Sequence, residues 1–305
     1  MRRLTALPVL AVAGLLFVSC APAGDPASDG PVVVVSTNIL GDVVDNLVGD
    51  DVEVVTLMRP GADPHSFEIS PAEAAQLREA DLVVSNGIGL EEGLQQHLDA
   101  AADAGARTFV AGDAVDVLPY TSTDAGGSDD PHFWTDPARM ISVIDALEGD
   151  LRDLDGVDEA AVAERTAAYR AEIERLDTEM TATFAALPAD RRALVTNHHV
   201  FGYLADRFDF RVIGAVIPGG TTLAAPSTSD LADLVAAIEE AGVPTIFAES
   251  SQPDRLVRAL AEEANVQVDV VELFTESLTD AAGGAPDYLT MMRANTERIS
   301  DGLSR

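Results

Sequence analysis

The chain has one cysteine, Cys20, and no lysine among its 305 residues. A lone cysteine excludes an internal disulfide. The 19 basic residues, all arginine, are outnumbered by 52 acidic ones, and the formal net charge is −33. Such a surface repels nucleic acid and anionic lipid, and it attracts cations without selectivity. We therefore expect no nucleic-acid partner.

Other signals are also missing from the sequence. No long apolar run occurs after the first 20 residues, so we expect a soluble mature chain. The Gly-x4-Gly-Lys-Ser/Thr motif that cradles phosphates is absent, and so is the His-Glu-x-x-His motif of zinc peptidases. The chain is therefore not expected to hydrolyse ATP, and no motif supports a zinc hydrolase.

The N-terminus has the layout of a secretory signal. Two arginines precede an apolar run at residues 4–18, which is too short to span a bilayer comfortably. Cys20 follows the small Ser19, where a lipoprotein signal peptidase would cut. We expect a signal peptide with a lipobox at residues 1–20 and an extracytoplasmic protein anchored to the cell membrane by lipid on Cys20. Secretion to the periplasm without an anchor is the alternative.

Residues 21–30 are Ala, Pro, Gly, Asp and Ser, a composition that predicts a flexible tether. Beyond them, β-branched runs alternate with helical patterns. Strands are predicted at 32–36, 52–58, 82–85, 108–111, 193–196, 212–217, 245–248 and 268–271. Helices are predicted at 39–48, 70–80, 90–104, 200–207, 231–241, 253–264 and 287–303. This alternation predicts a mostly parallel sheet covered on both faces in each half of the chain.

A longer helical pattern begins after His132 and pauses near Gly156. Residues 159–187 contain no glycine or proline, and a helix of this length extends ~43 Å, more than one lobe needs. The fold prediction is an α/β protein with two lobes, each containing a mostly parallel four-stranded sheet flanked by helices, joined by one long rigid helix. Its boundaries are an N-terminal lobe at 31–155, a linking helix at 156–189 and a C-terminal lobe at 190–305.

Four side chains that could bind a metal follow predicted strands. They are His65, His132, His198 and Glu276. Open parallel sheets bind ligands beyond the carboxyl ends of their strands, so two facing lobes would bring these side chains together. Three imidazoles and one carboxylate suit zinc, with manganese or iron as competitors.

The other two histidines are weaker candidates. His97 lies inside a predicted helix, and we expect it to face solvent or to flank the core. His199 adjoins His198 on an extended segment, where adjacent side chains point in opposite directions. We therefore expect only one of these two to reach a metal ion directly.

Several motifs resemble those of the zinc/manganese solute-binding lipoproteins of ABC importers. They are Arg-Pro-Gly-x-Asp-Pro-His-x-Phe at 59–67, Asp-Pro-His-x-Trp-x-Asp-Pro at 130–137, Thr-x-His-x-x-Phe-Gly-Tyr at 196–203, Ile-Phe-x-Glu at 246–249, Thr-Glu-Ser at 275–277 and Tyr-Leu-Thr-Met-Met-Arg-Ala-Asn at 288–295. The resemblance covers nearly all of the mature chain. It implies two α/β lobes, a rigid connecting helix and a metal ion buried between the lobes.

Carried over by position, the resemblance implies that His65, His132, His198 and Glu276 bind the metal. The family usually has aspartate at the last position, so the longer Glu276 leaves open whether one or two oxygens contact the metal. His199 and Glu249 are expected to orient the metal-binding side chains by hydrogen bonds. The histidine-rich loop of many zinc members is missing before His132, and residues 121–130 are instead expected to be a flexible loop or a weak gatherer of cations.

The expected function is high-affinity capture of zinc outside the cytoplasm and delivery to an ABC importer. The expected partners are a divalent metal ion, the membrane permease and a metal-donating chaperone, and the protein is expected to be a monomer and not an enzyme. One alternative is the manganese- or iron-binding component of the same importer type, and another is an adhesin on this scaffold. A rival from a different class is a secreted zinc hydrolase with Glu249 or Glu276 as general base.

Overall fold

The computed structural model of the chain describes residues 30–120, 126–263 and 269–304. The expected signal peptide, the anchor Cys20 and the tether up to residue 29 lie outside the described residues. Within the described ranges, no helix has both the length and the apolar character that crossing a membrane requires.

Each half of the chain forms a four-stranded sheet in which all paired neighbours are parallel. The strand orders are β2-β1-β3-β4 and β6-β5-β7-β8. The strands are β1 (Val32–Val35), β2 (Glu53–Thr56), β3 (Leu82–Ser85), β4 (Thr108–Val110), β5 (Ala193–Thr196), β6 (Arg211–Ala215), β7 (Thr245–Glu249) and β8 (Asp269–Leu273). Both sheets therefore have the same topology, and the predicted α/β fold with two four-stranded parallel sheets is confirmed.

Helices connect and cover the strands. They are α1 (Asn38–Val48), α2 (Pro71–Glu79), α3 (Gln95–Asp103), α4 (Pro137–Arg152), α5 (Glu159–Ala185), α6 (Gly202–Phe208), α7 (Thr228–Ala241), α8 (Arg255–Glu263) and α9 (Tyr288–Leu303). The start of α2 follows from its sequence, because Ser70 and Glu73 form a capping box next to a proline. The boundaries proposed for the lobes and the linking helix stay a prediction.

The predicted helix at 90–104 was wrong at its start, because α3 begins only at Gln95. Gly87, Ile88 and Gly89 have positive φ angles, which are incompatible with a right-handed helix. The Glu91 carboxylate then accepts hydrogen bonds from the backbone N–H groups at the end of β3. These bonds hold residues 86–94 in a turn.

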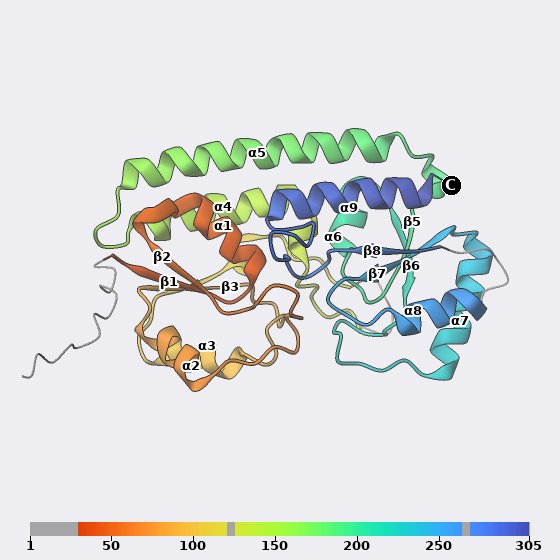
Figure 1. Cartoon of the computed structure of the whole chain (residues 1–305), viewed down its shortest axis with the longest axis horizontal. Helices are drawn as coiled ribbons and strands as arrows, with labels where there is room; N and C mark the ends of the chain where they lie inside the picture. Colours follow the sequence, from red (N-terminus) through yellow and green to blue (C-terminus); the bar gives the residue numbers. More distant parts are fainter. Residues whose placement is uncertain (1–29, 121–125, 264–268, 305) are drawn as a thin grey trace, which may run out of the picture.

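The helices lie on two sides of the sheets (Figure 1). On one side are α1, α4, α5 and α9, and the 27-residue α5 passes over both sheets. On the other side, α2 and α3 cover the first sheet, and α7 and α8 cover the second. The long helix thus joins the two halves along one side of the molecule.

The apolar core differs between these two sides. On the α5 side, one continuous cluster contains Val43, Ile144 and Ile173 together with Phe208 and Met292, so it draws on both halves of the chain. On the other side, the residues under α2 and α3 form one cluster and those under α7 and α8 form another. The two sheets therefore share a core on only one side.

The first turn of α9 is attached to α1. The backbone N–H of Tyr288 donates to Asp42 Oδ2 (2.9 Å), and the Tyr169 hydroxyl of α5 donates to the same oxygen (3.3 Å). Burial raises the pKa of Asp42 to about 6, and the two hydrogen bonds only partly oppose this shift. An ionised Asp42 therefore carries an energetic cost in the folded protein.

This cost predicts a pH-dependent gain in stability for Asp42→Asn. The pKa is higher in the folded than in the unfolded chain, so the contribution of Asp42 to the free energy of unfolding falls as the pH rises from about 4 to about 6. Asparagine keeps an oxygen acceptor without the charge. Urea unfolding should find the variant about 1–2 kcal/mol more stable at pH 7.5 and equal to the parent at pH 4. The exposed Asp50→Asn controls for the loss of one negative charge, and a pH-independent difference for Asp42→Asn would contradict the prediction.

Candidate metal centre

Four side chains from four loops meet between the two sheets. His65 follows β2, His132 lies between β4 and α4, His198 directly follows β5, and Glu276 follows β8. One potential ligand atom of each lies within 4.8 Å of the others, and each residue is at most 1% exposed. All four follow carboxyl ends of strands, which is where open parallel sheets place ligands.

The potential ligand atoms converge on one point. His132 Nε2 lies 3.3 Å from both His65 Nε2 and His198 Nε2. Glu276 Oε1 lies 3.0, 3.4 and 3.2 Å from the Nε2 atoms of His65, His132 and His198. The second oxygen, Glu276 Oε2, is buried and has no hydrogen-bond partner among the described residues. Buried polar atoms without partners are costly, and a divalent cation would satisfy this set.

Two of the imidazoles are oriented by carboxylates on their far side. Asp130 Oδ1 accepts the backbone N–H of His132 (3.0 Å) and lies 2.7 Å from His132 Nδ1. Glu249 Oε1 accepts the backbone N–H of His198 (3.1 Å) and also contacts His198 Nδ1. Because an ionised carboxylate can only accept, each Nδ1 keeps a proton, and in the neutral imidazole Nε2 is the nitrogen that is free to bind a metal.

His65 is held differently. Asp63 Oδ1 accepts its backbone N–H (2.9 Å), as Asp130 does for His132, so the two Asp-Pro-His sequences form the same local turn. The ring Nδ1 of His65, however, has no hydrogen-bond partner among the described residues, and the nearest carboxylate oxygen, of Glu92, is 3.9 Å away. His65 is therefore the least constrained of the three imidazoles.

The charges in the centre depend on one another. Burial lowers the pKa of His198, but Glu249 and Glu276 raise it well above its ordinary value. Burial likewise lowers the pKa of His132, but Asp130 raises it above its ordinary value. Burial raises the pKa of Glu276, and the neighbouring imidazoles outweigh this and hold it well below its usual range. Without a metal ion, the site therefore favours an ionised Glu276 and protonated His132 and His198.

The structure does not bring the remaining sequence candidates into the cluster of four. His199 is buried, and its ring centroid lies 6.4 Å from that of Tyr120. His97 is partly buried on α3. In the predicted loop at 121–130, Asp129 forms an antiparallel bridge with Pro119. Residues 121–125 of this loop lie outside the described residues.

Three residues near the centre were not found from the sequence. Tyr120 places its hydroxyl 3.5 Å from His132 Nδ1 and donates to the carbonyl of Gly220 (2.7 Å). Asp63 and Asp130 support the histidines two residues later. The repeated Asp-Pro-His could have identified the two aspartates, but Tyr120 precedes a polar loop and carries no comparable signal.

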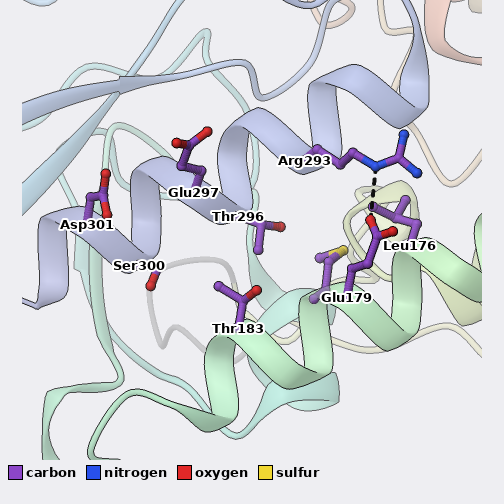
Figure 2. Close-up of a pocket in the computed structure, with 9 residues that line it drawn as sticks. Leu176, Glu179, Thr183, Arg293, Thr296, Glu297, Ser300 and Asp301 are labelled. Carbon is purple, nitrogen blue, oxygen red and sulfur yellow. Dashed lines mark hydrogen bonds and ion pairs between the residues drawn. The ribbon is translucent and has the colours of Figure 1, made fainter.

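A separate groove lies between α5 and α9 (Figure 2). It encloses about 260 Å³ and is lined in part by Leu176 and Met180, with an ion pair between Glu179 and Arg293 at its edge (3.0 Å). None of the four clustered residues lines it. It is therefore distinct from the candidate metal centre.

Comparison with known proteins identifies the family. Residues 33–302 match the family described as zinc-uptake complex component A, periplasmic. The chain belongs to this family. The membership confirms the resemblance found in the sequence motifs, since both point to the substrate-binding proteins of metal ABC importers.

Named relatives differ in their metal. The zinc-binding protein TroA of Treponema pallidum is 32% identical over 287 residues, which cover 92% of each chain. The manganese ABC transporter substrate-binding lipoprotein PsaA of Streptococcus mitis is 27% identical over 312 aligned positions, with both chains fully covered. The solved structure of the T. pallidum protein superposes with a TM-score of 0.83 at 29% identity, covering 90% of this chain and 100% of that one. A manganese-bound periplasmic metal-binding protein from Candidatus Liberibacter asiaticus gives a TM-score of 0.79 at 25% identity, with coverage of 90% and 99%.

The electrostatic coupling predicts the effect of Glu249→Gln on the metal-free protein. Glu249 is the largest influence that raises the pKa of His198, and glutamine keeps an acceptor while removing the charge. The variant should lower the pKa of His198, so that the imidazole loses its proton at a lower pH than in the parent. NMR of the imidazole nitrogens across a pH titration measures this. Glu263→Gln on the exposed side of α8 should leave the titration unchanged, and an unchanged pKa in Glu249→Gln would refute the assignment.

Proposed function

We propose that the protein captures a divalent metal ion outside the cytoplasm and delivers it to the membrane permease of an ABC importer. His65, His132, His198 and Glu276 would bind the ion. The observation that carries this proposal is the buried convergence of their four ligand atoms within 4.8 Å of one another. The metal is a transported substrate here, and the same four residues must both hold it and release it.

Zinc is the metal that we propose, with manganese or iron as the alternative. Three imidazole nitrogens and one carboxylate oxygen are a common donor set for zinc. Glu276 Oε2, which has no hydrogen-bond partner in the described ranges, could add a second oxygen, and more oxygen ligands favour manganese. Among the relatives, the T. pallidum protein is named as zinc-binding and the S. mitis protein as a manganese transporter component.

The arrangement favours a carrier over a hydrolase. Catalytic zinc sites usually have three protein ligands and leave one position open for water. Here four side chains would surround the ion, and Glu249, a candidate general base, already accepts from His198. An adhesin on the same scaffold stays the other alternative, and a growth defect confined to zinc-poor medium would favour transport.

The proposal includes the location and the partners of the protein. A lipid on Cys20 would hold the mature chain at the outer face of the cell membrane, next to the permease. The S. mitis relative is named as a lipoprotein, which supports this arrangement. The protein would act as a monomer, with a metal-donating chaperone as a further partner.

Elemental analysis and metal competition test the proposal directly. The chain from Ala21 onward, without the lipid anchor, should hold one tightly bound ion, and competitive titration should rank zinc above manganese. His132→Ala should lose the ion because it removes the central imidazole. His97→Ala is the matched control and should bind like the parent. No tightly held metal in the parent protein would refute the proposal, whereas a preference for manganese would change only the identity of the substrate.

Proton release should accompany metal binding. The pKa values of His132 and His198 are raised in the metal-free protein, whereas a metal ion requires neutral imidazoles. Affinity should therefore fall as the pH is lowered from about 8 to about 6, and about one to two protons should leave per ion near pH 7. Calorimetry in buffers of different ionisation enthalpy counts these protons. Binding without proton release would contradict the assigned protonation states.

A further inference from the structure

The candidate metal centre lies between two walls that are held together differently. One is on the side of α5, and the other is on the side of α2, α3, α7 and α8. On the side of α5, a single apolar core runs through both halves of the molecule. On the opposite side, the core under α2 and α3 is separate from the core under α7 and α8. Separating the halves on the α5 side would expose shared apolar surface, and on the opposite side it would not.

The loop that carries Glu276 belongs to the wall with the shared core. Trp134 Nε1 donates to the carbonyl of Thr275 (2.8 Å). Asn38 Nδ2 donates to Ser277 Oγ (2.8 Å), and Asn38 Oδ1 accepts from the backbone N–H of Leu278 (2.9 Å). These buried bonds attach residues 275–278 to the loops that lead into α1 and α4. Glu276 therefore stays close to the first half of the chain.

On the opposite wall, the connection depends on Asp63. Its Oδ2 accepts from the hydroxyl of Thr222 (2.7 Å) and from Gln252 Nε2 (2.7 Å). The same oxygen accepts from its neighbour Ser66 (3.0 Å), while Oδ1 accepts the backbone N–H of His65 (2.9 Å). One carboxylate thus joins the His65 loop to two loops of the second half of the chain.

The three loops that Asp63 joins lead into helices that belong to the two separate cores. Asp63 lies on the loop that leads into α2, Thr222 on the loop that leads into α7, and Gln252 on the loop that leads into α8. These are the helices whose cores are separate. The two cross-lobe hydrogen bonds of Asp63 therefore connect the parts of the molecule that no shared apolar core holds together.

Tyr120 reinforces the same connection. Its hydroxyl donates to the carbonyl of Gly220 (2.7 Å), two residues before Thr222. A Cβ atom on Gly220 would lie only 2.4 Å from the Tyr120 ring, so a glycine is needed for this close approach. Gly220 and Thr222 are thus held by Tyr120 and Asp63, which also contact His132 and His65 of the metal centre.

We propose that Asp63 acts as a latch, a side chain whose hydrogen bonds to Thr222 and Gln252 hold the metal cleft closed. The ion enters and leaves between the His65 loop and residues 217–224. This inference rests on the proposed metal-binding function. Opening breaks the side-chain hydrogen bonds of Asp63 and Tyr120, while the shared core and the Glu276 loop keep their contacts. Asp63 also holds the backbone of His65, so release of the latch loosens the least constrained imidazole at the same time.

The test removes the two donors and leaves Asp63 and the metal-binding residues unchanged. Thr222→Val with Gln252→Met abolishes both cross-lobe hydrogen bonds. Thr178→Val with Gln96→Met is the matched control, because Thr178 is exposed on α5 and Gln96 is exposed on α3, both outside residues 217–224. Zinc is loaded on each protein, and its transfer to excess chelator is followed by stopped flow. Amide hydrogen exchange of residues 217–224 is measured on the metal-free proteins.

The double variant should still bind one zinc ion but release it about 10- to 100-fold faster than the parent, because two hydrogen bonds to a buried carboxylate are lost. Its residues 217–224 should also exchange faster without metal, and the control should match the parent in both measurements. Asp63→Asn keeps an acceptor for the backbone N–H of His65 but replaces the oxygen that accepts from Thr222 and Gln252. It should therefore behave like the double variant. Parental release and exchange rates in the double variant would overturn the latch. A parent protein that binds no zinc would refute the proposed function instead, while faster exchange in the double variant would still support the latch.

Discussion

The apolar core beneath α5 is the interaction on which the rest of the structure depends. Neither half of the chain contains the whole candidate centre, since His65 and His132 come from the first half and His198 and Glu276 from the second. The side chains that α5 packs against come from both halves, among them Ile144 and Met292. This core sets the distance between the two sheets, and the carboxyl ends of the strands can therefore meet at one buried point.

Such a point is electrostatically demanding. Asp130, Glu249 and Glu276 are all buried and acidic, and burial of several carboxylates is tolerated only when each finds a proton donor or a cation. Asp130 and Glu249 each pair with the Nδ1 of an imidazole, which turns its Nε2 toward the centre. Glu276 faces the imidazole nitrogens, and within the described part of the chain its second oxygen has no hydrogen-bond partner. The cluster is therefore balanced by protons when empty and would be balanced by a divalent ion when filled.

The two walls of the cleft serve different purposes. Apolar contact on the α5 side is non-directional and proportional to area, so it resists opening by a small movement. Hydrogen bonds to Asp63 and Tyr120 are short-ranged and directional, so a small movement breaks them together. A carrier must hold its ion tightly and still release it, and this division allows one side to remain closed while the other opens.

Much of the fold could be predicted from the sequence because the relevant signals are local. The β-branched run Val32–Val35 and the capping box at Ser70 specify elements through their own residues, and the parallel topology follows from strands alternating with helices. The predicted start of α3 was wrong because the turn at 86–94 depends on the Glu91 carboxylate folding back onto backbone N–H groups. Helical periodicity does not reveal such a contact. The sequence pattern also did not reveal the role of Ser227. Its capping box with Asp230 begins α7 three residues before the predicted start at residue 231.

The sequence by itself determined which residue types stand at the ends of the strands, and that was enough to nominate His65, His132, His198 and Glu276 as a set. Only the tertiary structure decided that their ligand atoms meet, that Asp130 and Glu249 orient two of the rings, and that Asp63 and Tyr120 span the cleft. The physical reason is that strand ends and caps are governed by neighbouring residues. A contact such as that between Asp63 and Gln252 instead depends on how the two sheets are packed against each other, and no local pattern encodes that packing.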